Sequence, residues 1–190
     1  MSNAIKTALA FAGIAAAAVS PALAHTGGVV TGFGAGVSHP VLGADHLLAM
    51  VAVGLWSAAQ PREKAWQAPV LFMLLLAAGA GLGLAAIPLP FVEPGILVSI
   101  FGLAVLLIAG RRIPSALALT VIAVFALLHG HAHGAEAAGA IGAYMAGFLV
   151  ASTALHLAGY GIGRLVSTTR HGLAASGLAV LTAGLVLAGG

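Results

Sequence analysis

The sequence has no cysteine and few charged residues. Its 190 residues include four acidic and seven basic side chains, 6% charged in all, whereas a soluble domain carries about 25%. The shortage of charge excludes a soluble globular domain. The absence of cysteine excludes disulfides and thiolate metal ligands. The basic residues occur as scattered pairs rather than as a patch, which excludes nucleic acid as a partner.

In place of charge, the sequence has long apolar runs. Hydrophobic residues make up 61% of the chain, and runs of about 20 apolar residues can cross a hydrocarbon core about 30 Å thick as helices. We expect an all-α, polytopic membrane bundle, with a signal peptide over 1–24 and a single transmembrane domain over 25–190. The six expected spans are approximately Val29–Ala59, Ala65–Ile87, Gly95–Ala109, Pro114–Leu128, Ala137–Gly163 and Gly172–Ala188.

The N-terminal segment has the features of a secretory signal. One lysine precedes an apolar stretch too short for a comfortable span, and alanines stand at 22 and 24. Cleavage after Ala24 would make His25 the mature N-terminus, and we expect both termini outside the bacterial cytoplasmic (inner) membrane. Every basic residue of the mature chain would then lie inside, as the positive-inside rule requires. These residues are Arg62, Lys64, Arg111, Arg112, Arg164 and Arg170.

The stretch HPVLGADH, residues 39–46, interrupts the first span. As one straight helix that span would be about 46 Å long, more than a bilayer needs. Pro40 removes a helical hydrogen bond, so we expect a break near Pro40 and a regular helix resuming near Ala44. Broken helices are tolerated in membranes where the freed backbone faces protein or a watery cavity, and such breaks commonly host ion sites.

The polar side chains at this break predict a metal site. An unpaired carboxylate at the bilayer centre costs about 2.5–3.5 kcal/mol, and no lysine or arginine lies in any expected span to offset Asp45. A divalent ion bound by His39, Asp45 and His46 would balance that charge. Asp45 is expected to meet His39 across the break, while Met50 shares a helix face with His46. In the structural alternative, the histidines bond between helices and Asp45 caps the resumed helix.

The second polar stretch is HGHAHGAE, residues 129–136, which is expected to connect the fourth and fifth spans on the outside. In a helix, His129 and His133 would share a face with Glu136 one turn beyond; in an extended segment, His131 would line up with both. Three histidines at alternate positions are more typical of a flexible segment that binds divalent ions than of a rigid zinc site, which usually has four fixed ligands. A solvated polar loop is the alternative.

Two further histidines are candidates for binding the metal ion at other points on its way across the membrane. His156 is expected about 12 Å from the cytoplasmic end of its span, either as a core histidine bonded to a hydroxyl or carbonyl, or as the next stop for an ion moving inward. His25 is expected to help capture metal at the outer surface. Small residues spaced by four, such as Gly79 and Gly83, predict close packing of helices.

Three motifs together resemble the HupE/UreJ family of nickel permeases, found beside hydrogenase and urease assembly genes. They are HPVLGADHLLAMVAVGLWSA, HGHAHGAE and TALHLAG, and the resemblance extends over essentially the whole chain. It implies His39, Asp45 and His46 as ligands, and more loosely His129, His133, Glu136 and His156. A broader class of nickel and cobalt transporters has an H-x4-D-H signature; here five residues separate His39 from Asp45, which points to the HupE/UreJ branch.

The predicted function is import of a divalent transition-metal ion, with Ni²⁺ as the expected transported substrate and no prosthetic group. Cobalt transport, a metal sensor or accessory subunit, and an intramembrane metalloenzyme are the alternatives. The sequence has no H-E-x-x-H motif, which argues against an enzyme, and no G-x4-G-K-[ST] loop, which argues against ATP hydrolysis. The expected partners are the ion and the lipid bilayer. A homo-oligomer, an outer-membrane metal uptake system and intracellular metallochaperones are left open.

Overall fold

The computed structural model describes residues 32–137 and 139–189, and every regular element within them is helical. The predicted all-α class is therefore confirmed, while the expected signal peptide and His25 lie outside the described residues. The helices are α2 (Phe33–Leu42), α3 (Ala44–Ala58), α4 (Gln67–Leu84), α5 (Val92–Ala109), the short 3-10 helix η1 (Gly110–Arg112), α6 (Ser115–Glu136), α7 (Ile141–Val166) and α8 (Gly172–Gly189).

The first span is broken, as predicted. Five of the described helices are long and apolar enough to cross a membrane, and α2 with α3 makes a sixth span bent by 79°. The break falls at Gly43, which has an extended backbone, three residues beyond Pro40. A Cβ at Gly43 would lie 3.2 Å from the His39 carbonyl oxygen and 3.4 Å from His46 Nδ1. Gly43 thus allows the polar groups on both sides of the break to come close together.

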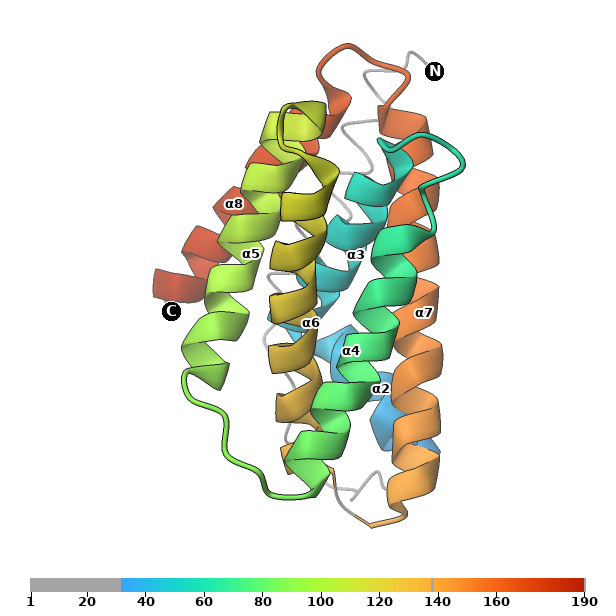
Figure 1. The fold of residues 1–190 in the computed structure, drawn as a ribbon, viewed down its shortest axis with the longest axis vertical. Coiled ribbons are helices and arrows are strands. Elements are labelled where there is room, and N and C mark those ends of the chain that lie inside the picture. The colour runs from blue at the N-terminus through green and yellow to red at the C-terminus, as the bar shows by residue number, and fades with distance from the viewer. Residues whose placement is uncertain (1–31, 138, 190) are drawn as a thin grey trace.

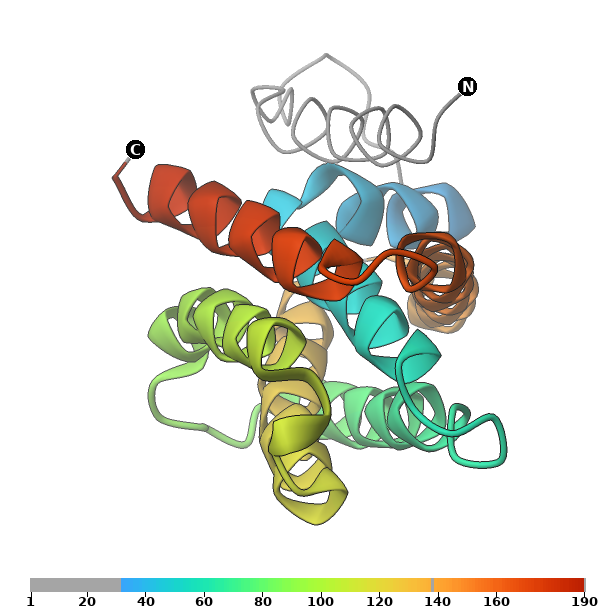
Figure 2. The ribbon, with the colours of Figure 1, turned by 90° about the horizontal axis from the view of Figure 1, so that it is seen from above.

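Helix α3 occupies the centre of the bundle and packs against α7, α5 and α8 (Figures 1 and 2). Every residue from Leu48 to Ala58 is buried. A helix that is apolar on all sides has no lipid-facing stripe, so it is stable only when other helices surround it. The outer helices expose apolar side chains instead, including Leu74, Leu157 and Leu185.

Helices α4 and α6 approach so closely that their backbones touch. A Cβ added at Gly79 would lie 2.2 Å from the Leu127 carbonyl oxygen, and one at Gly134 would lie 2.1 Å from the Ala80 carbonyl oxygen. The predicted packing role of Gly79 is therefore confirmed. On α6, Gly130 has the same role against Leu76, which the sequence analysis missed.

Residues 129–136 were expected to connect two spans, but they form the last two turns of α6. Of the two conformations considered for this stretch, the helix is therefore the one that the structure has, and the polar-loop alternative is wrong. Glycines and polar residues in that stretch suggested a connection, since both are common in loops. In the folded chain the glycines face α4, and His129 and His133 turn inward and are fully buried. Close helix packing therefore overrides the local preference.

The two ends of the bundle differ in charge. The connections α3–α4, α5–α6 and α7–α8 lie at one end, and the connections α4–α5 and α6–α7 lie at the other (Figure 1). All six basic residues of the described chain lie in or beside the first three connections. We call this the basic end. The positive-inside rule predicts that it faces the cytoplasm.

We predict that Gly134→Leu destabilises the protein by about 1–3 kcal/mol or more, because the new side chain would force α4 and α6 apart. Gly161→Leu is the matched control, since no atom lies within 4 Å of a Cβ at Gly161. Thermal unfolding of both variants in detergent would test this. Equal midpoints for the two variants would contradict the proposed backbone contact.

Candidate metal centre

Four histidine rings from three helices lie together in the half of the bundle away from the basic end. The ring centroid of His46 on α3 lies 4.3 Å from that of His133 and 4.8 Å from that of His129, both on α6. The centroid of His39 on α2 lies 4.6 Å from that of His133. The structure therefore brings the two predicted motifs into one group, which we call the histidine cluster.

Asp45 contacts His46 and not His39, so the expected contact across the break is wrong. Its Oδ1 accepts hydrogen bonds from the His46 backbone N–H at 2.8 Å and from His46 Nδ1 at 2.7 Å. The cap position of α3 is Gly43, with no side-chain cap hydrogen bond, so Asp45 does not cap the resumed helix. The second hydrogen bond, from Nδ1, orients the imidazole, as carboxylates commonly do for metal-binding histidines.

His39 instead contacts Glu136 at the exposed edge of the cluster. His39 Nε2 lies 3.1 Å from Glu136 Oε2, and 37% and 53% of the two side chains are exposed. His46, His129 and His133 are buried behind this pair. The last turn of α6 therefore supplies a carboxylate at the entrance to the cluster.

Three of the buried histidines, His46, His129 and His156, share one arrangement of their ring nitrogens. Nδ1 of His129 donates to the Phe125 carbonyl oxygen at 2.8 Å, and Nδ1 of His156 donates to the Ser152 carbonyl oxygen at 2.7 Å. His46 does the same toward Asp45. When Nδ1 carries the proton, Nε2 of a neutral imidazole holds a free lone pair.

The Nε2 atoms of these histidines have no hydrogen-bond partner. Those of His46, His129, His133 and His156 are all buried and unpaired among the described residues. Buried polar atoms are normally hydrogen-bonded, so several orphaned atoms of one type need an explanation. The Nε2 lone pairs of His46, His129 and His156, left free by these Nδ1 hydrogen bonds, are donors suited to a divalent transition metal.

The donors form a series of neighbouring rings rather than a closed cage, and the His39 and His46 ring centroids lie 6.0 Å apart. Within the described residues, no three histidine or carboxylate groups converge as the ligands of a closed metal site do. The order is His39 at the edge, then His133 and His46, then His129. Such an arrangement suits an ion that is passed on more than one that is held permanently.

Phe72 separates the cluster from His156. Its ring centroid lies 6.0 Å from that of His129 and 4.9 Å from that of His156, and its side chain is fully buried in α4. The sequence offered no signal for this residue, since one phenylalanine in an apolar run is ordinary. Tyr144, whose hydroxyl lies 3.5 Å from His133 Nδ1, was also missed.

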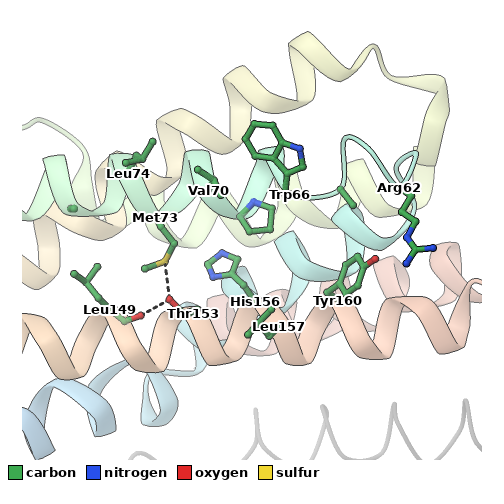
Figure 3. A pocket seen from close by; sticks show the side chains of 13 residues that line it. Arg62, Trp66, Val70, Met73, Leu74, Leu149, Thr153, His156, Leu157 and Tyr160 are labelled. Atoms are coloured by element: carbon green, nitrogen blue, oxygen red, sulfur yellow. Dashed lines mark hydrogen bonds between the residues drawn. The ribbon is translucent and has the colours of Figure 1, made fainter.

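Beyond Phe72, His156 lies on the wall of a pocket between α4 and α7 with a volume of about 730 Å³ (Figure 3). The pocket extends along both helices to Arg62 at the basic end. Thr153 is one turn from His156, and its hydroxyl contacts the sulfur of Met73 at 4.0 Å. The side chains that line the pocket are mostly apolar, and His156 is the histidine among them.

The other predicted ligands lie elsewhere. His131 points away from the cluster, and its Nε2 donates to the Ile87 carbonyl oxygen at 2.8 Å. Met50 is fully buried in the apolar core of α3. Of the three histidines between residues 129 and 133, His129 and His133 therefore turn into the bundle and His131 turns outward.

The chain is similar to known proteins over almost its whole length. The pattern of the family described as "HupE / UreJ protein" matches residues 12–187. The chain is 39% identical to "Protein HupE" from Rhizobium leguminosarum bv. viciae over 174 residues, which cover 90% of this chain and 88% of the relative. No solved structure matches. The chain therefore belongs to the HupE/UreJ family, whose members are multi-pass membrane transporters of the nickel/cobalt type and not enzymes.

Proposed function

We propose that the protein imports Ni²⁺ across the cytoplasmic membrane for the assembly of a metalloenzyme such as hydrogenase or urease. The observation that carries this proposal is the set of buried, unpaired Nε2 atoms in and beyond the histidine cluster. Imidazole nitrogen binds nickel, cobalt and copper(II) well, so selectivity comes from geometry and supply. Cobalt is the alternative cargo.

In this proposal the ion enters at His39 and Glu136, whose exposed side chains offer one nitrogen and one carboxylate. It then moves to His133, His46 and His129 as it loses water. Asp45 orients His46 and contributes negative charge that offsets the cost of a dication in a low-dielectric site. His25 remains a predicted auxiliary ligand; in this proposal Met50, in the apolar core of α3, and His131 have no part in the route.

Phe72 is the barrier in this route. Its ring offers no donor to a partly dehydrated cation, and it lies between the last histidine of the cluster and His156. Rotation of the ring would connect the two sides, after which His156 receives the ion beside the pocket that leads to the basic end. A membrane potential of 100 mV supplies about 4.6 kcal/mol for a dication moving inward.

Asp45→Asn and His46→Ala should each lower radiolabelled nickel uptake by about 10–100-fold, because one removes the orienting carboxylate and the other a ligand. Cells would express each variant at equal membrane levels, with and without excess cobalt. His131→Ala is the matched control and should keep uptake, since His131 faces away from the cluster. Normal uptake by both cluster variants would refute the route.

Uptake should fall at acid pH, because a protonated imidazole has no lone pair for metal. The sign follows from competition: protons and metal ions use the same nitrogen. Proteoliposomes with a clamped membrane potential would separate this effect from changes in driving force. Uptake that stays unchanged down to the lowest pH at which the protein remains folded would mean that neutral imidazole is not the binding group.

Phe72→Ala should accelerate nickel flux down a concentration gradient by about tenfold, equivalent to a barrier lowered by about 1.4 kcal/mol. Phe72→Leu, which keeps apolar bulk, should change the flux much less. Stopped-flow measurement with a metal-sensitive dye inside liposomes would compare the two, after size-exclusion chromatography confirms folding. A flux through folded Phe72→Ala no faster than wild type would show that Phe72 is not the barrier.

A further inference from the structure

A second polar cleft lies at the basic end, between the end of α5 and the start of α8. Its volume is about 620 Å³. Basic side chains from two connections far apart in the sequence line one side of it. They are Arg111, Arg112, Arg170 and His171. This cleft, which we call the arginine cleft, is separate from the histidine cluster and from the pocket beside His156.

Within the described residues, no carboxylate pairs with the arginines of the arginine cleft. Both ion pairs of the described residues join a histidine to a carboxylate. Of the four acidic residues of the chain, Asp45 and Glu136 belong to the histidine cluster, and Glu93 begins α5 at the opposite end. Glu63 lies in the α3–α4 connection beside Arg62. The three exposed guanidinium groups are therefore free to pair with an external anion.

The other side of the cleft is apolar and continues into the lipid-facing surface. Leu107, Ile108 and Leu173 line it, and just below it α8 packs tightly on α5, where a Cβ at Gly177 would lie 2.7 Å from Ile108. Farther along the same two helices, Val105 and Leu178 are 54% and 55% exposed. A ligand that fills the whole cleft therefore has a charged head and an apolar tail.

We propose that the arginine cleft binds an anionic phospholipid, with the headgroup phosphate on Arg111, Arg112 and Arg170. Guanidinium groups bind phosphate oxygens in a bidentate manner. The first turn of α8 adds backbone N–H groups and the positive end of its dipole. The acyl chains lie along α5 and α8, a contact that free phosphate would leave unfilled. Basic clefts of this kind on the cytoplasmic side attract anionic lipids.

The test uses the purified intact chain in detergent micelles, with native mass spectrometry of bound phosphatidylglycerol and phosphatidylcholine. Arg111→Gln with Arg112→Gln should weaken phosphatidylglycerol binding by about 25-fold, or about fivefold for each charge removed. Arg62→Gln with Lys64→Gln is the matched control. It removes the same charge at the same end, but Arg62 lies at the separate pocket between α4 and α7 (Figure 3). This control should bind as wild type does.

Arg170→Gln provides a second variant with a single change in the other connection, in case the double variant does not fold, and it should weaken binding about fivefold. Inorganic phosphate is tested in a parallel arm by its effect on the thermal unfolding midpoint. Three results would overturn the proposal: equal binding of the two lipids, equal losses in the cleft and control variants, or stabilisation by inorganic phosphate as strong as that by phosphatidylglycerol.

Discussion

Direct contact between helix backbones at glycine is the interaction on which the rest of the structure depends. Lipid provides no hydrophobic drive for helices to associate, so close packing and internal hydrogen bonds must hold them together. The contact of α4 with α6 at Gly79, Gly130 and Gly134 extends α6 through residues 129–136 and turns its histidines inward. Without that contact, His129 and His133 would not reach His46.

The histidine cluster combines rigid orientation with unpaired acceptors. His129 and His156 each donate Nδ1–H to a carbonyl of their own helix, and His46 donates to Asp45. A buried lone pair without a partner costs free energy, and a passing dication can recover that cost by occupying it. In the proposed route, donors that do not converge on one point would each bind the ion incompletely, which favours transfer over retention.

Negative and positive side chains lie toward opposite ends of the molecule. The carboxylates at the cluster lie toward one end, the arginines toward the other, and Phe72 lies between the cluster and the pocket of His156. In the proposed route a cation is attracted at the entrance, and in the orientation predicted by the positive-inside rule the arginines face an anionic leaflet. Positive charge concentrated at one end also fits a fixed orientation in the membrane.

Composition and spacing by themselves determined the class, the spans and the break near Pro40, because long apolar runs and a helix-breaking proline act locally. They also identified His39, His46, His129, His133 and Glu136, since polar side chains stand out in an apolar chain. Only the tertiary structure decided that Asp45 contacts His46, that His131 turns outward, and that Phe72 separates His129 from His156. These relations depend on how helices distant in the sequence rotate against one another, and backbone contacts at Gly79 and Gly134 determine that rotation.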